Sequence, residues 1–328
     1  MKIKVLGNHS AAGRAPYEWR PGYVFTDDPS CAEYDWLVVL DEMPGDDRGT
    51  FRGGFEPLAC PRERTILATW EPVTVKRYSR AYTRQFGHLL SNRPPSAERH
   101  PRYHLGRGYY PWFSGHTLDE LSRIPPKSRM ISAVCSAKRM RRTQHRARFR
   151  LIGEIAAAVP GFDWYGKGVK PLERKYEALD AYRYHVVAEN HIAAHHWTEK
   201  LSDAFICECL PFYAGDPAVA EAFPEESFIP IPMDDPAEAV RIIRSAMAAG
   251  EYEKRRDAVL EAKRRILGEY NFWDQVISVI EESRNDGVTP PDPAKPVRIY
   301  ARKALRRISP AAALEDAWLH LKLCAGVI

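Results

Sequence analysis

The sequence lacks the features of a disulfide-rich, zinc-ribbon or membrane-spanning protein. Its six cysteines are scattered and form no CxxC pair, which argues against a disulfide framework and against a zinc ribbon. No window approaches about eighteen consecutive apolar residues, and the N-terminal MKIKVLGNHS lacks the apolar core of a signal peptide. We therefore expect a cytoplasmic protein without a membrane span, in which most cysteines are small core residues.

The chain also lacks a strong net charge and an internal repeat. Its formal net charge is +5, and this mild excess alone predicts neither a nucleic acid nor an anionic membrane as partner. The 328 residues are 45% hydrophobic and 28% charged, an ordinary globular composition at a length that favours two domains. No repeat of solenoid period is present.

Short apolar runs alternate with amphipathic stretches along most of the chain. In the first third, residues 3–6, 36–40 and 65–69 have the composition of buried strands, with long proline- and glycine-rich loops between them. Strands that alternate with helices predict an α/β fold with parallel, doubly wound sheets covered on both faces. Beyond residue 130 we expect strands at 130–135, 162–165, 184–188, 211–213 and 228–231, and helices at 143–159, 172–182, 198–207, 236–249 and 251–267.

Two proline-containing breaks divide the chain. The first, at residues 121–128, holds a proline pair among polar residues, and the second lies at residues 286–294. We predict a domain at 1–125, a second domain at 126–285 and a helical tail at 286–328.

The tail has the pattern of a basic amphipathic helix. Between residues 297 and 308 apolar side chains recur at helical spacing, and arginines and lysines occupy the other positions. Such a helix either lies on an anionic membrane or packs against the body of the protein with its basic face in water. Trp318 and Leu321 add apolar surface nearby, so peripheral membrane contact through residues 297–323 is one of the two interpretations.

The segment ENHIAAHHWTEKL, residues 189–201, joins a predicted strand to a predicted helix. Ligands of open parallel sheets bind beyond the carboxyl ends of the strands, which is where this loop lies. Thr198 suits the helix N-cap and Glu199 the first turn, whereas a cation at Lys200 opposes the helix dipole at a cost of up to about 1 kcal/mol. A bound phosphate would remove that penalty; the alternative is an exposed lysine whose stem covers apolar surface.

The three histidines of this segment, His191, His195 and His196, do not form a convincing metal site. His191 and His195 are four residues apart, but a segment that follows a strand and precedes an N-cap is poorly placed to be helical. We predict no metal ion there.

A second basic segment precedes the first. Seven lysines and arginines lie between residues 138 and 150, a density that suits nucleic acid phosphates. No aromatic residue interleaves with them before Phe149, and no nucleic-acid reader motif is present. We favour a site where one arginine holds a small diphosphate bidentately while the others are solvated.

Residues 182–217, YRYHVVAENHIAAHHWTEKLSDAFICECLPFYAGDP, resemble the donor-binding motif of the family 10 glycosyltransferases, the α-1,3/1,4-fucosyltransferases. The matching blocks are Glu-Asn at 189–190, Thr-Glu-Lys at 198–200 and Gly-Asp-Pro at 215–217, in the family's order and spacing. The resemblance extends forward to 223–229 and, more loosely, back to 146–149; the N-terminal third matches only weakly.

This resemblance implies a glycosyltransferase-B architecture, with two Rossmann-like domains facing a cleft. The C-terminal domain would hold GDP-fucose and the N-terminal domain the acceptor, so that fucose passes with inversion to a hydroxyl of an N-acetylglucosamine-containing glycan, such as a lipid-linked or lipopolysaccharide acceptor. By position in the motif, the donor-binding residues are Arg146 and Lys200 at the phosphates, and Glu189, Asn190, His196 and Glu199 around the nucleotide sugar.

His196 stands where the family has tyrosine, which leaves open a transferase of the same scaffold that uses another nucleotide sugar. A third interpretation is a nucleic-acid or membrane binding protein built on the basic segments at 138–150 and 298–307.

The chemistry of the transfer needs a base for the acceptor hydroxyl and positive charge for the leaving diphosphate. Glu71 directly follows the predicted strand at 65–69, in a sequence context similar to that of the family's base, and is our candidate. His88, His100 and His104 are weaker candidates. No Asp-x-Asp metal motif lies beside a strand, so we expect cationic side chains to hold the diphosphate without a required metal, although a divalent ion could stimulate the reaction.

Overall fold

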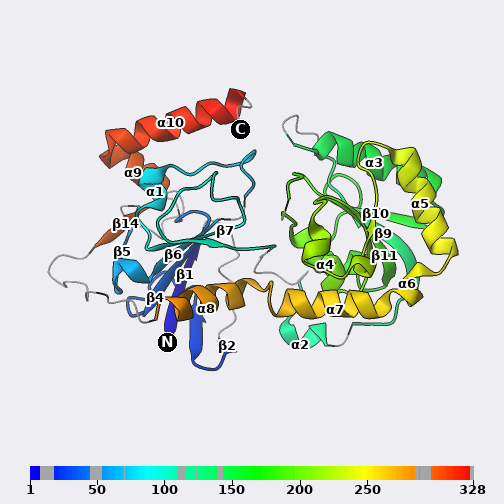
Figure 1. The fold of residues 1–328 in the computed structure, drawn as a ribbon, viewed down its shortest axis with the longest axis horizontal. Helices are drawn as coiled ribbons and strands as arrows, with labels where there is room; N and C mark the ends of the chain where they lie inside the picture. The colour runs from blue at the N-terminus through cyan, green and yellow to red at the C-terminus, as the bar shows by residue number, and fades with distance from the viewer. Residues whose placement is uncertain are drawn as a thin grey trace. The chain divides into compact units, whose positions relative to one another are not determined.

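The computed structural model describes most of the chain and divides it into two compact α/β units (Figure 1). The first unit joins Met1–Gly106 to Phe272–Ile328, and the second unit is Arg107–Asn271. The described residues are 1–7, 18–44, 54–69, 71–108, 115–122, 124–138, 143–194, 196–284, 288 and 297–325.

The predicted domain boundaries at 125 and 285 differ from this division. Residues 107–125 belong to the second unit, where Leu121 is part of the hydrophobic core and its carbonyl accepts a hydrogen bond from Lys263 at 2.7 Å. The chain returns to the first unit before residue 285, since Trp273 packs on Phe25 with ring centroids 4.8 Å apart. A proline-containing break marks a loop, but it does not show which core the neighbouring residues join.

Among the described residues, the first unit is built on a seven-stranded sheet in the order β2-β3-β1-β4-β6-β7-β8. All neighbouring strands are parallel except β2 and β3. Every residue of β4 and β6 is buried, as expected of strands covered on both faces, and the three strands predicted in this region are confirmed. The strands are β1 (Lys2–Gly7), β2 (Glu18–Arg20), β3 (Tyr23–Thr26), β4 (Trp36–Leu40), β6 (Thr65–Thr69), β7 (His88–Ser91) and β8 (Tyr103–Leu105).

Helices and one small sheet complete the first unit. The strands β5 and β14 pair antiparallel, so the C-terminal segment is joined to the N-terminal half by main-chain hydrogen bonds. Figure 1 shows α10 beside α9 and α1. The elements are η3 (Arg62–Arg64), β5 (Phe55–Pro57), α1 (Arg80–Thr83), α8 (Phe272–Glu282), β14 (Arg298–Tyr300), α9 (Arg302–Ile308) and α10 (Pro310–Ala325).

In its described residues, the second unit is built on a five-stranded, all-parallel sheet in the order β10-β9-β11-β12-β13. The strands predicted beyond residue 130 are confirmed, within small differences at their ends. The strands are β9 (Arg129–Val134), β10 (Phe162–Tyr165), β11 (Tyr182–Ala188), β12 (Leu210–Ala214) and β13 (Ile229–Pro230), and the helical elements are α2 (Leu118–Leu121), α3 (His145–Ala158), η4 (Lys175–Ala178), α4 (Glu199–Ile206), η5 (Val219–Glu221), η6 (Glu225–Ser227), α5 (Pro236–Ala248), α6 (Glu251–Lys254) and α7 (Arg256–Leu267).

Two helix predictions for the second unit are wrong in part. The helix expected at 172–182 is only the 3₁₀ turn η4, because Tyr182 is already part of the sheet and pairs with Arg129. The helix expected at 251–267 is interrupted at Arg255, where φ −102° and ψ 6° separate α6 from α7.

The strand order places a topological switch between β9 and β11. From β9 the chain first adds β10 on one side and then β11 on the other, so the loops that leave β9 and β11 diverge at the carboxyl edge of the sheet. In open α/β sheets with this order, ligands bind at the switch. The loops after β9 and β11 are therefore where a ligand of the second unit is expected.

The tail is not the single basic amphipathic helix predicted for residues 297–308. Its first residues form β14 and α9, and Ile299, Ala301 and Ala304 are buried in the first unit. This part of the tail therefore packs against the body of the protein, which was one of the two interpretations.

The exposed apolar side chains of the tail come after this packed part. They are Ile308, Leu314, Trp318 and Leu321, and membrane contact stays a prediction that depends on them. In the described part of the chain, no helix is both long enough and apolar enough to cross a membrane.

All six cysteines lie in the described residues, and none of them forms a disulfide. Cys60, Cys135, Cys207 and Cys209 are buried. The prediction of small core cysteines without a disulfide framework is confirmed.

The carboxyl edge at the switch is held together by a close main-chain approach. The N–H of Cys135, which follows β9, donates to the carbonyl of Tyr165 at 2.8 Å, and Gly166 comes next in the chain. A Cβ atom on Gly166 would lie 2.5 Å from the Cys135 carbonyl oxygen, and its φ of +139° is a conformation that other residues rarely adopt.

We predict that Gly166→Ala lowers the free energy of unfolding by about 2 kcal/mol or more, because it adds both backbone strain and a clash. Gly153→Ala is the matched control: a Cβ there would contact only Trp164, at 4.0 Å, so this change inside α3 should stabilise by about 0.5 to 1 kcal/mol. Urea unfolding of the two variants measures both values. Equal effects of the two changes would contradict the close approach at Gly166.

Candidate functional site

The two loops at the switch are joined directly. The N–H of Gln144, the N-cap of α3, donates to the carbonyl of Asn190 in the loop after β11 at 2.9 Å. The helices α3 and α4 both begin at this edge, so their N-terminal N–H groups lie near the two loops. Two segments that the sequence analysis assigned to phosphate or donor binding therefore meet here. They are the basic segment, through Gln144, and the Glu-Asn segment at 189–190.

A buried carboxylate organises the start of α4. Glu189 is 0% exposed, and its oxygens accept hydrogen bonds from the Thr198 N–H at 2.9 Å and from the Thr198 hydroxyl at 2.7 and 2.9 Å. The Thr198 hydroxyl in turn accepts from the Lys200 N–H at 3.3 Å, as an N-cap does. Thr198 as N-cap is confirmed, and Glu189 acts here as a scaffold for the loop.

The charge of Lys200 is compensated within the chain. Its Nζ donates to Thr198 Oγ1 at 2.8 Å and lies 3.4 Å from Glu189 Oε2 and 3.2 Å from Glu199 Oε1. Neither a bound anion nor an exposed lysine, the two explanations offered from the sequence, is needed to account for this cation in the first turn, because two carboxylates already offset its charge. Its side chain is 17% exposed, and replacing it would also leave Glu189 unpaired.

Arg148 is the residue best suited to bind an anion. It lies on the inner face of α3 with Leu151, Ile152 and Ile155 and is only 6% exposed. Its Nε is buried without a hydrogen-bond partner, and among the described residues its side chain forms no hydrogen bond or ion pair. A buried, unpaired ion costs several kcal/mol, so a guanidinium in this state is suited to receive an anionic ligand.

Several positive charges act on the residues around Arg148. Burial lowers the pKa of His145, and the nearby charges of Arg148, Lys138 and Lys200 lower it further. Burial raises the pKa of the Cys135 thiol, against the opposing effect of Arg148 and Lys200. Arg148 and Lys200 both affect the pKa of Cys135, which follows β9, and of His145, at the start of α3. Both charges therefore lie near the switch.

Arg146, the arginine predicted for the donor phosphates, lies on another face of α3. Two residues along a helix correspond to about 200° around its axis, and Arg146 is exposed. It lines a shallow hollow formed by Arg146, Phe149, Arg150, Gly153 and Glu154. Arg148 belongs to the same basic segment. Its helical spacing from Leu151, Ile152 and Ile155 could have indicated from the sequence that it lies on the buried face of the helix.

The remaining predicted donor residues lie in the same loop. Asn190 is partly exposed, and its buried Oδ1 has no hydrogen-bond partner within the described ranges. His196 is buried, and its ring packs edge-on against His191 with centroids 5.3 Å apart. His195 lies outside the described residues.

Glu71 directly follows β6, at the carboxyl edge of the first unit's sheet. The buried guanidinium of Arg93 donates to the Glu71 carbonyl, from Nε at 2.7 Å, and to the Lys76 carbonyl at 2.9 Å. Arg93 is itself paired with the buried Glu98. The main chain at Glu71 is thus fixed while its side chain is partly exposed.

The competing histidines are less suited to act as a base. His88 begins β7, at the opposite edge of the sheet, and its Nδ1 lies 3.0 Å from Nε2 of His104. Both ring nitrogens of His100 lie within hydrogen-bonding distance of main-chain carbonyls, at 3.0 and 3.2 Å. Burial lowers the pKa of His100 and of His104.

Two Rossmann-like units, each built on a parallel sheet with covering helices, define the glycosyltransferase-B fold. Comparison with solved structures agrees. A crystal structure of an α1,3-fucosyltransferase with GDP-fucose aligns over 89% of this chain and 92% of its own, with a TM-score of 0.51 and 14% identity. A further α1,3-fucosyltransferase crystal structure aligns over 89% and 92%, with a TM-score of 0.51 and 16% identity.

These likenesses establish the fold. No protein-family model matches the chain, and no curated protein sequence matches it. The family 10 resemblance therefore rests on the motif at 182–217.

Glu199 offers a pH test of this arrangement. Burial raises its pKa, but Lys200 and Lys175 outweigh that effect and lower the pKa from 4.5 to about 2. A carboxyl group with a lowered pKa stabilises the folded state above its ordinary pKa, and this contribution is lost as the pH falls towards the folded-state pKa.

We expect Glu199→Gln to lower the free energy of unfolding at pH 7 by about 1 to 3 kcal/mol, the range for a charge-assisted hydrogen bond. The difference from the unmodified chain should shrink as the pH falls below about 4.5. Urea unfolding across pH 7 to 3 measures it, with Glu253→Gln as control for an exposed carboxylate, 56% exposed. A difference that does not change with pH would show that Glu199 is not held ionised by these lysines.

Proposed function

We propose that this chain is an inverting glycosyltransferase that binds GDP-fucose in its second unit and transfers fucose to a hydroxyl of an N-acetylglucosamine-containing glycan. The observation that carries the proposal is Arg148, a largely buried arginine whose Nε has no hydrogen-bond partner among the described residues, at the switch between β9 and β11. A nucleoside diphosphate sugar supplies the anion that this position lacks.

Three features support a diphosphate rather than another anion. The positive charges of Arg148, Lys138 and Lys200 act together near His145. The N-termini of α3 and α4 add main-chain N–H donors and the positive ends of two helix dipoles. The motif at 182–217 and the likeness to a fucosyltransferase crystallised with GDP-fucose favour GDP-fucose among nucleotide sugars.

In the transfer, the acceptor hydroxyl oxygen attacks the anomeric carbon as the bond from that carbon to the diphosphate breaks. The proton of the hydroxyl passes to the carboxylate of Glu71, and GDP leaves with the bonding electrons. The guanidinium of Arg148, the charge of Lys200 and the helix N-termini stabilise the negative charge that develops on the diphosphate. No divalent metal is required for this, because the side chains supply the positive charge.

Lys200 has a shared role in this proposal. It keeps its ion pair with the buried Glu189, and a phosphate oxygen replaces the more exposed Glu199 as its partner. Glu199 is then free to accept a hydrogen bond from a hydroxyl of the ribose or of the sugar. Asn190, whose buried Oδ1 has no partner, can accept a further one.

Thermal stability with added ligands tests the donor class. Micromolar GDP and GDP-fucose should raise the melting temperature, because a ligand that binds only the folded state stabilises it by mass action. A larger shift with a UDP-sugar would instead support the transferase that uses another donor, as His196 leaves open. A shift only with short oligonucleotides or anionic vesicles would support the binding-protein interpretation and contradict the proposal.

We predict that Arg148→Met weakens GDP binding by about 1.5 to 3 kcal/mol, roughly 10- to 100-fold. The same change should leave the melting temperature of the ligand-free protein unchanged or raise it, because an apolar side chain replaces an unpaired buried charge. Titration calorimetry and thermal unfolding measure the two effects.

Arg146→Met is the matched control for Arg148→Met, since it removes an exposed arginine of the same helix. Its GDP affinity should stay near that of the unmodified chain. Weaker GDP binding in Arg146→Met, with normal GDP binding in Arg148→Met, would show that Arg146 contacts the phosphates, as the motif implies.

We predict that Glu71→Gln lowers the turnover number by about 100-fold or more, the scale of a lost general base. Its affinity for GDP should be unchanged, because Glu71 belongs to the first unit and is assigned no donor contact. Initial rates with GDP-fucose and a glycan acceptor, together with calorimetry, separate the two properties. Near-normal turnover would eliminate Glu71 as the base.

A further inference from the structure

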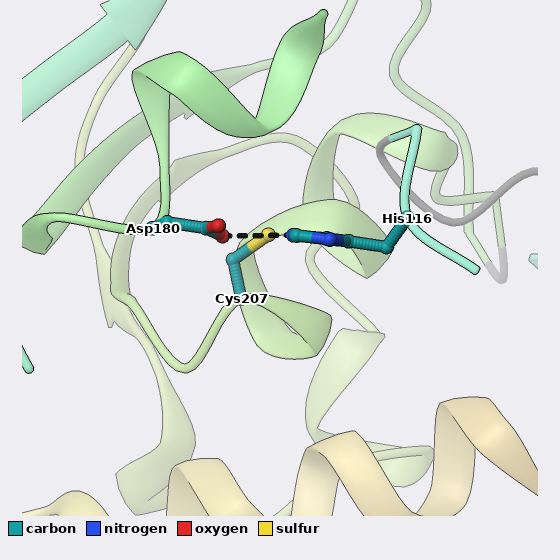
Figure 2. Close-up of side chains that lie close together, drawn as sticks. All are labelled: His116, Asp180 and Cys207. Carbon is teal, nitrogen blue, oxygen red and sulfur yellow. Dashed lines mark hydrogen bonds and ion pairs between the residues drawn. The ribbon is translucent and has the colours of Figure 1, made fainter. Parts of the chain in front are cut away.

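Three metal-binding side chains meet at the amino edge of the second unit's sheet, away from the switch. His116 lies just before α2, Asp180 just before β11, and Cys207 at the end of α4. One ligand atom from each lies within 4.8 Å of the other two, and Figure 2 shows the three side chains pointing toward one another. The three residues are far apart in the sequence, so no local spacing pattern predicts this cluster.

The cluster is well shielded from water. Cys207 is 0% exposed, and the side chains of His116 and Asp180 are 7% and 15% exposed. The His116 ring stacks on Tyr176 with centroids 4.5 Å apart. His116 is therefore held in one orientation, with Nε2 3.0 Å from Asp180 Oδ1.

The other ring nitrogen of His116 is incompletely satisfied. Nδ1 is buried and has no hydrogen-bond partner in the part of the chain that the structure describes, and Glu120 Oε2 lies 3.7 Å from it. When a metal ion binds one nitrogen of a histidine, the other nitrogen carries the proton and commonly faces a carboxylate. A metal ion at Nε2 would place an N–H of His116 opposite Glu120, which is that arrangement.

The main chain of two of these residues is held by one ammonium group. Lys127 Nζ donates to the carbonyl of Asp180 at 2.8 Å and to the carbonyl of Cys207. The segment that leads into β11 and the end of α4 are thus fixed next to each other before any ion binds. Such preorganisation lowers the cost of assembling a site.

We propose that Cys207 Sγ, His116 Nε2 and a carboxylate oxygen of Asp180 bind a zinc ion, with water in the fourth position. Thiolate, imidazole and carboxylate together suit Zn²⁺ and disfavour Mg²⁺ and Ca²⁺. One thiolate and one carboxylate neutralise the two positive charges of the ion.

Zinc binding at this site displaces one proton. Zn²⁺ replaces the thiol proton of Cys207, which is released to solvent, and the imidazole proton of His116 moves from Nε2 to Nδ1, toward Glu120. In tetrahedral zinc sites the ligand atoms lie roughly 3.3 to 3.6 Å apart, so contraction of a cluster already within 4.8 Å completes the set. The ion would clamp the loop before α2 to the sheet and to α4, a structural role that does not depend on the proposed function.

Cobalt substitution tests the site on the full-length chain. Co²⁺ added to the metal-free protein should bind one ion per chain and give the near-ultraviolet absorption of a thiolate–cobalt bond, and Zn²⁺ should abolish that absorption by displacement. Cys207→Ser should abolish it and weaken Zn²⁺ binding by about 100-fold or more. Cys209→Ser, which removes a buried thiol two residues away, should leave it intact.

Glu120→Gln tests the proposed second partner of His116. It should weaken Zn²⁺ binding by about 10-fold, the lower end of the range for partners of metal-bound histidines. Zinc stoichiometry by mass spectrometry of His116→Gln and Asp180→Asn carries the same test if Cys207→Ser does not fold. Absence of the absorption, its persistence in Cys207→Ser, or zinc retained by both other variants would overturn the proposal.

Discussion

Arg148 is almost completely buried, and its Nε has no hydrogen-bond partner among the described residues, so this incompletely paired charge costs the folded protein free energy that an anionic ligand would recover. The burial of other residues on the same face of α3, such as Leu151 and Ile155, offsets this free-energy cost. The position of the charge is set by the strand order, which makes the loops after β9 and β11 diverge at one point. A diphosphate bound there would satisfy Arg148, and this is why the fold and the proposed donor chemistry fit together.

The two edges of the second sheet have different tasks in this interpretation. At the carboxyl edge, Glu189 fixes Thr198 and Lys200 at the start of α4. The N-terminus of this helix is therefore ordered before any ligand binds. At the amino edge, the end of the same helix carries Cys207 beside His116 and Asp180. The helix α4 therefore connects a proposed nucleotide site to a proposed zinc site through eight residues.

The sequence predicted the sheets well because strands buried on both faces consist of continuous apolar runs, as in β4 and β6. It placed the Thr-Glu-Lys motif in the loop after β11 and at the start of α4, since this motif is local. It did not separate Arg146 from Arg148, because both lie in one basic segment and only the packing of α3 decides which one faces the core. It also treated Lys200 as lacking a partner, since the buried position of Glu189 is a property of the folded loop.

Features that depend on contacts between distant segments were beyond prediction. The return of the chain to the first unit at Phe272 follows from packing such as Trp273 on Phe25. The tail was predicted to be an amphipathic helix because Val297, Tyr300 and Ala304 have helical spacing, but the pairing of β14 with β5 places the start of this segment in a sheet. The cluster of His116, Asp180 and Cys207 has no local pattern at all.

A crystal structure of the chain with GDP bound would show whether the buried arginine is the receptor for the diphosphate. We expect a phosphoryl oxygen within about 3 Å of a guanidinium nitrogen of Arg148, at the switch between β9 and β11. GDP bound elsewhere, with Arg148 still lacking an acceptor, would contradict the assignment of this site.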